Sequence, residues 1–267
     1  MFAALALWMT VSAPAWAQSE PTADELVDLG MKQLKRGNYT KALATLQRVR
    51  NYYRDDKASI RAQLVIADLH FKKRDFEQAR FAYEEFRDLH PNHPQIDYVT
   101  WRIGQSVYKR ASKFAGRDQG ATRSAVTVWS GFDRRFPDSE YIDDVEKLLG
   151  KGRARLANKE LYVAKFYLRR GAYASVRGRA EGLVRRYGDT EAAVEGYALL
   201  GMALHATGEV DSARAVRDKL AERAPKSKEL EQLDRALQKP AGTPPEKTVF
   251  VRPYRTRGGG GQPGAPQ

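Results

Sequence analysis

The sequence predicts an all-α protein in which pairs of helices repeat along the chain. The first observation is a recurring alanine early in the second helix of a pair: Ala42 and Ala79 lie 37 residues apart, and Ala213 has the same setting. A recurring helix end and a recurring small residue in each first helix are the other two observations. They predict a right-handed superhelix of about five tetratricopeptide-like helix pairs with a C-terminal capping helix.

Five segments carry the signature of one helix ending and another beginning. Proline ends a helix because it lacks an N–H donor and clashes with the preceding turn, and an Asp, Asn, Ser or Thr that follows can cap the next helix. The segments are Tyr53-Arg54-Asp55, His90-Pro91-Asn92, Phe136-Pro137-Asp138, Tyr187-Gly188-Asp189 and Ala224-Pro225-Lys226-Ser227. The small residues expected at close helix crossings are Gly30, Ala67, Gly104, Ala164 and Gly201.

The elements follow in order from these markers. Thr22 is expected to cap the first helix, because Glu25 follows it at the capping-box spacing. The pairs are predicted at 22–55, 58–91, 95–137, 141–188 and 190–225, and a helix near 227–238 is expected to cover the last open face. An insertion of about nine residues around 112–121 lengthens the third pair; it indicates either a functional edge or a tolerated surface loop. Residues 141–158 are expected to extend the first helix of the fourth pair.

The two ends of the chain differ from the predicted repeat domain at 18–238. Residues 1–17 contain a short apolar run followed by small residues at the two positions that signal peptidase reads, so they predict a cleaved signal peptide. A transmembrane anchor is the alternative, but the run is too short to cross about 30 Å of hydrocarbon. Residues 239–267 are rich in proline, glycine and basic residues and predict a disordered tail.

The net charge of +13 is unevenly distributed. Residues 151–189 hold eleven basic residues against three acidic ones, and residues 239–267 hold five against one. A basic face of this kind favours an acidic partner, anionic head groups or nucleic acid. The alternative is a set of solvated helix faces without a specific partner.

Residues suited to catalysis are not grouped in any recognisable pattern. The chain has no cysteine, and its four histidines do not stand at ligand spacings with carboxylates. We therefore expect no enzyme activity, no catalytic residues, no metal and no cofactor. Stacked helix pairs instead form grooves for peptides or partner domains, and aromatic residues of the first helices are candidate interface anchors: Tyr98, Trp101, Tyr108, Tyr162, Phe166, Tyr167 and Tyr197.

Four segments resemble the BamD (ComL-type) outer membrane assembly lipoproteins: residues 117–119, 122–125, 135–141 and 160–173. The similarity covers roughly residues 22–226. It implies a scaffold in the periplasm, at the inner face of the outer membrane of a Gram-negative bacterium. Such proteins dock through their C-terminal repeats onto a POTRA domain of the barrel-inserting subunit, and their N-terminal repeats receive unfolded barrel proteins. A general periplasmic adaptor for envelope or peptidoglycan maintenance is the alternative function.

The resemblance also implies candidate docking residues. Arg179 and Glu181 match a family Asn-Arg-x-Glu-Gly segment, in which Gly178 replaces the Asn. Arg179 is the first candidate because its planar fork suits a carboxylate of the partner, and the other candidates are Glu181, Arg177, Tyr173 and Arg170. Gln18 stands where the family carries a lipid-modified cysteine. We therefore expect membrane association through partners, or a divergent paralogue with a different client.

Overall fold

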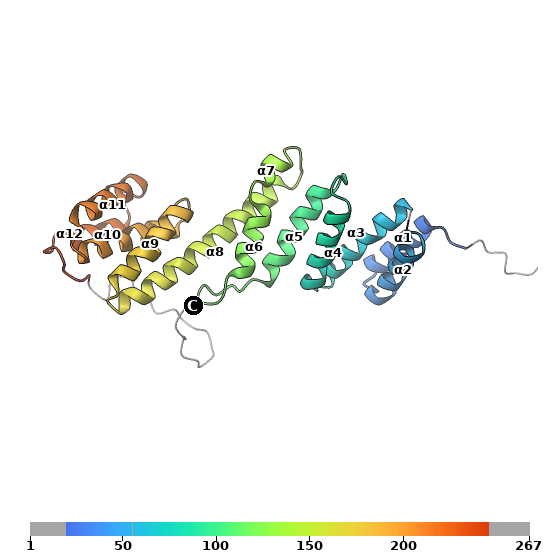
Figure 1. The fold of residues 1–267 in the computed structure, drawn as a ribbon, viewed down its shortest axis with the longest axis horizontal. Coiled ribbons are helices and arrows are strands. Elements are labelled where there is room, and N and C mark those ends of the chain that lie inside the picture. The colour runs from blue at the N-terminus through green and yellow to red at the C-terminus, as the bar shows by residue number, and fades with distance from the viewer. Residues whose placement is uncertain (1–19, 55, 246–267) are drawn as a thin grey trace, which may run out of the picture. The chain divides into compact units, whose positions relative to one another are not determined.

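The computed structural model describes residues 20–54 and 56–245, and these form twelve α-helices and no strand. They divide into two compact units, the first ending at Lys73 and the second beginning at Arg74. Consecutive helices pack against each other within each unit (Figure 1). The predicted all-α class, built of adjacent helix pairs, is therefore confirmed.

The first unit contains three helices: α1 (Ala23–Lys35), α2 (Tyr39–Tyr52) and α3 (Lys57–Lys72). The predicted capping box is present at the start of α1. The backbone N–H of Thr22 donates to Glu25 Oε2 at 2.8 Å, and the backbone N–H of Glu25 donates to Thr22 Oγ1 at 3.3 Å. Two of the N–H groups that a helix start leaves unpaired are thereby satisfied.

The second unit contains nine helices: α4 (Phe76–Leu89), α5 (Ile96–Arg110), α6 (Gly120–Trp129), α7 (Phe132–Arg135), α8 (Ile142–Arg169), α9 (Tyr173–Tyr187), α10 (Ala192–Ala206), α11 (Val210–Arg223) and α12 (Lys228–Leu237). Helix α8 has 28 residues, as expected from the extension predicted for the fourth pair. The inserted residues form the connection between α5 and α6, and α12 packs on α10 and α11 as the predicted capping helix.

The small residues predicted at helix crossings are buried, and at the glycines among them a side chain would crowd the neighbouring helix. A Cβ added to Gly30 would lie 2.7 Å from Leu46 Cγ, and one added to Gly201 would lie 2.8 Å from Leu233 Cδ1 of the capping helix. Such distances leave no room for a methyl group. The three marker alanines of the second helices are fully buried: Ala42, Ala79 and Ala213.

In four of the helix pairs, the turn between the two helices contains a residue in the left-handed conformation. Gly37, Gly171 and Gly208 have φ values of 78°, 70° and 85°, and Arg74 has a φ of 66° at the corresponding turn between α3 and α4. Glycine adopts this conformation without the steric cost that a Cβ brings. Three of these turns therefore use the residue best suited to them, and one does not.

Of the predicted tail, residues 239–245 are described, and the backbone N–H of Gly242 donates to the carbonyl of His205 at 3.0 Å. The predicted signal peptide at 1–17 and most of the predicted tail, from residue 246 on, lie outside the described residues. In the described part of the chain, no helix combines the length and apolar character that a membrane span requires.

Candidate functional site

The turn between α8 and α9 sets the direction of α9. The left-handed Gly171 reverses the chain, and α9 then packs along α8 through a shared core cluster. Three buried residues of α9, spaced four and three apart, form this contact: Val176, Ala180 and Leu183. Their spacing fixes the buried side of α9 and therefore the direction in which each of its arginines points.

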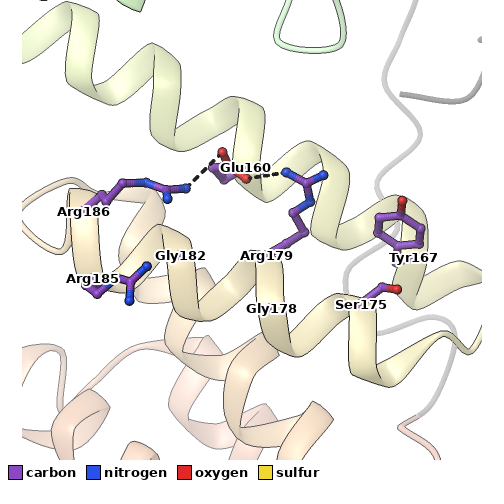
Figure 2. A pocket seen from close by; sticks show the side chains of 8 residues that line it. All are labelled: Glu160, Tyr167, Ser175, Gly178, Arg179, Gly182, Arg185 and Arg186. Atoms are coloured by element: carbon purple, nitrogen blue, oxygen red, sulfur yellow. Dashed lines mark hydrogen bonds and ion pairs between the residues drawn. The ribbon is translucent and has the colours of Figure 1, made fainter. Parts of the chain in front are cut away.

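Glu160 of α8 joins two of these arginines. Its Oε2 lies 3.4 Å from Arg179 Nη1, and its Oε1 lies 3.2 Å from Arg186 Nη2. Figure 2 shows the carboxylate of Glu160 between the two guanidinium groups. The Glu160 side chain is 17% exposed, whereas those of Arg179 and Arg186 are 43% and 49% exposed. The carboxylate therefore holds the two arginines in place while much of their surface stays accessible to a partner.

These ion pairs border a shallow groove of about 380 Å³ on α8 and α9. Its lining contains three arginines and one carboxylate, so it carries a net positive charge. Gly178 leaves one part of the groove open, since a Cβ there would meet no atom within 4 Å. The lining residues are Glu160, Tyr167, Ser175, Gly178, Arg179, Gly182, Arg185 and Arg186 (Figure 2). Exposed guanidinium groups beside open space suit the carboxylates of an acidic partner.

Arg153 of α8 anchors the end of α9 near this groove. It donates to both carboxylate oxygens of Asp189, at 3.1 and 2.6 Å, and to the backbone carbonyl of Arg186 at 3.0 Å. The hydrogen bond from Arg153 lowers the pKa of Asp189, and the same bond raises the pKa of Arg153. Because the last turn of α9 is tied to α8, the position of Arg186 beside Glu160 is fixed from both sides.

The structure separates the five residues that the sequence suggested for partner binding. Arg179 alone lies in the groove. Arg177 faces the opposite side of α9 and forms an ion pair with Glu209, while Glu181 is exposed. Tyr173 packs against the α8–α9 core cluster, and the guanidinium of Arg170 lies 3.8 Å from the centre of the Phe166 ring. The structure therefore does not bring these five residues into one site.

Sequence reasoning missed the residues that accompany Arg179. Glu160 and Arg186 complete the two ion pairs, and Arg185 adds a third cation to the lining. The spacing of Arg179, Gly182 and Arg186, three and then four residues apart, places them on one helix face and was readable in the sequence. That Glu160 faces them depends on how α8 and α9 pack, which the sequence pattern does not specify.

The groove offers binding groups rather than a reaction centre. It has no histidine or cysteine, and Ser175 and Tyr167 are its only hydroxyl-bearing residues. Across residues 20–54 and 56–245, no three His, Cys, Asp or Glu side chains are grouped so that they could hold a metal ion. The lining offers guanidinium donors of a kind suited to anionic groups.

Comparison with known proteins gives consistent matches over most of the chain. The family model for YfiO, described as an outer membrane lipoprotein, matches residues 19–220. The outer membrane protein assembly factor BamD of Neisseria meningitidis serogroup A is 28% identical over 227 residues, covering 82% of this chain and 85% of that protein. BamD of Neisseria gonorrhoeae is 27% identical, covering 77% and 80%. BamD of Pasteurella multocida is 26% identical, covering 66% and 71%.

Proposed function

The chain belongs to the YfiO family of outer membrane lipoproteins, and we propose that it is a non-catalytic periplasmic scaffold of the machinery that assembles outer membrane β-barrel proteins. The observation that carries the proposal is the family match over residues 19–220. Similar proteins in three species are named outer membrane protein assembly factors. A fold of adjacent helix pairs supports a scaffold, because such repeats bind other chains along their exposed faces.

The groove beside Arg179 is the proposed docking surface for a POTRA domain of the barrel insertase. Its three arginines exceed its single carboxylate, so an acidic patch on the partner would complement it. The guanidinium of Arg179 has five N–H donors. Its ion pair with Glu160 involves only the Nη1 nitrogen. Arg179 therefore keeps donors for a partner carboxylate while Glu160 holds it in position.

The N-terminal helix pair is the proposed receiver of unfolded barrel proteins. Tyr52 on α2 and Leu29 on α1 are 80% and 45% exposed, so both side chains are available for contact. An unfolded chain that passes over the first unit could cover both.

Contacts with the insertase are proposed to hold the repeats at the inner face of the outer membrane.

Affinity purification from a Gram-negative host tests the docking proposal. The tagged full-length chain is expected to retain a barrel protein that carries POTRA domains, and Arg179→Glu is expected to lose most of it. Lys219→Glu is the matched control, because it makes the same charge change on the exposed face of α11. Retention of the partner by Arg179→Glu would assign docking to another face, and absence of any such partner would end the proposal.

A further inference from the structure

Gly178 is a glycine of α9 that the described part of the chain does not itself require. It is exposed in the middle of the helix, and its backbone is not in the left-handed conformation that favours glycine. A Cβ added there would meet no atom within 4 Å. Glycine is less favourable than alanine inside a helix, because it loses more conformational freedom on folding. Gly178 therefore weakens α9 without a gain in packing or backbone geometry.

Two neighbouring glycines do have a reason within the fold. Gly171 has a φ of 70° in the turn before α9, and a Cβ added to Gly182 would lie 3.0 Å from Arg186 Nη2. Gly150 of α8 is exposed and open like Gly178, but it is not part of the groove lining. An open glycine alone therefore does not mark a site, and the position of Gly178 within the groove decides the argument.

Gly178 shares one side of α9 with a groove arginine that has no carboxylate partner. Four lining residues follow each other three or four positions apart, which places them on the same side of a helix. We call them the open row: Ser175, Gly178, Gly182 and Arg185. Arg179 and Arg186 instead share the carboxylate of Glu160. Among the described residues no carboxylate pairs with Arg185, and Figure 2 shows it apart from the two ion pairs of Glu160.

We propose that Gly178 and Arg185 determine which partner the docking groove accepts: the partner's chain passes directly over Gly178, and one of its carboxylates pairs with Arg185. Glycine allows another backbone to approach a helix closely, because no Cβ stands between them. The exposed guanidinium of Arg185 has five N–H donors for the carboxylate. The two residues lie seven positions apart, or about 10 Å along the helix axis, a distance that about four residues of an extended segment span.

A protein segment fits the open row better than a membrane surface does. Helices that lie in a bilayer interface present apolar side chains beside their cations, and the open row contains only Ser, Gly and Arg. A bilayer surface is also broad, whereas a single segment can enter a groove of about 380 Å³. The inference rests on the proposed function, because it assigns two further residues to the same docking surface.

Substitution of Gly178 tests the close approach. Isothermal titration calorimetry measures the affinity of the purified full-length chain for the insertase's POTRA domains. Gly178→Leu is expected to weaken binding about tenfold or more, because a side chain there would clash with the partner, and Gly178→Ala to weaken it less. Both variants should raise the melting temperature, since alanine and leucine favour a helix over glycine. A loss of affinity together with a gain in stability is not the result of a folding defect.

Gly150→Leu is the matched control, because it makes the same change at an open, exposed position of α8 outside the groove. It should raise the melting temperature and leave the affinity unchanged. Arg185→Gln is expected to weaken binding about tenfold, as for an arginine at an interface hot spot, and Lys219→Gln to change it little. Gly178→Leu combined with Arg185→Gln should lose less than the sum of the two losses, because the leucine already keeps the carboxylate from Arg185.

The outcomes separate this inference from the docking role of Arg179. If Arg179→Glu abolishes binding while Gly178→Leu and Arg185→Gln bind as the wild type does, the inference is wrong and the docking proposal stands. If only the open-row variants lose binding, the inference stands and the role of Arg179 is wrong. No binding of the POTRA domains by the wild type overturns both. Binding to phosphatidylglycerol vesicles that depends on Arg185, with POTRA binding unaffected by Arg185→Gln, would also overturn the inference.

Discussion

Gly104 of α5 lies against the indole ring of Trp129 of α6 so closely that a Cβ on Gly104 would overlap Nε1 and Cε2 of that ring. Trp129 is fully buried, and its Nε1–H donates to the backbone carbonyl of Trp101 at 3.3 Å. The indole can therefore not move away without breaking this partly buried hydrogen bond. This contact determines how closely α5 and α6 approach each other.

Gly104→Ala is predicted to destabilise the protein by about 1–3 kcal/mol, because overpacking a filled core forces side chains or backbone to shift. The free energy of unfolding from urea titration measures the effect. The near-ultraviolet circular dichroism of the tryptophans should change as well, since the added methyl group displaces the Trp129 ring. A variant as stable as the wild type would show that α5 and α6 can separate freely.

Gly150→Ala is predicted to have the opposite effect. Gly150 is exposed in the middle of α8, and a Cβ there would meet no atom within 4 Å. Alanine favours the helix over glycine by up to about 1 kcal/mol. The melting temperature should therefore rise for this substitution and fall for Gly104→Ala. A fall for both would indicate that α8 tolerates no change at this exposed position.

Arg74→Gly is predicted to stabilise the chain by about 0.5–1 kcal/mol. Arg74 has a φ of 66°, whereas Gly37, Gly171 and Gly208 occupy the corresponding turns of other pairs. A left-handed conformation costs a non-glycine residue about 1–2 kcal/mol, and part of the relief is offset by the greater freedom of glycine in the unfolded chain. Gly171→Ala, measured in parallel by urea unfolding, should lose stability for the same reason. Equal stabilities of wild type and Arg74→Gly would argue against strain at this turn.

The ion pair between Arg153 and Asp189 is predicted to weaken in acid. The hydrogen bond from Arg153 holds the pKa of Asp189 below its ordinary value of 3.8. A pKa that is lower in the folded state means that the stabilisation is present above the unfolded pKa and is lost as the pH falls through the folded pKa. The Asp189 side chain is 60% exposed, so the contribution stays below about 1 kcal/mol.

Asp189→Asn is the variant that measures this contribution. It should lower the free energy of unfolding at neutral pH and have progressively less effect as the pH falls below about 4. Urea titrations of wild type and variant across that range give the difference at each pH. A difference that is independent of pH would show that the pair does not act through the charge of Asp189.

The sequence was sufficient to predict the helix pairs because their markers are local. A small residue such as Gly30 or Ala42, a capping residue such as Thr22 and a proline after the second helix each report on a few neighbouring positions. Their repetition then indicated five helix pairs and a capping helix without knowledge of any long-range contact, although the short α7 was not predicted. The lengthened α8 was expected too, because residues 141–158 are added at the front of the fourth pair.

The site was less predictable because its contacts link different helices. The resemblance identified Arg179, but Glu160 lies on α8, nineteen residues earlier, and their contact depends on how the two helices cross. Arg177 and Arg179 were both predicted to bind the partner. Side chains two residues apart on a helix, however, point in directions about 200° apart. Helical periodicity alone would have placed them on opposite sides of α9, as the structure does.

The central claim is that Arg179 in its groove docks an acidic surface of the barrel insertase. The direct measurement is the equilibrium affinity of the purified chain for the insertase's POTRA domains, by isothermal titration calorimetry, for wild type, Arg179→Ala and Lys219→Ala. The account predicts that Arg179→Ala weakens binding by about thirtyfold or more, as expected for an interface hot spot, and that Lys219→Ala changes it little. Equal affinities for wild type and Arg179→Ala would contradict the claim.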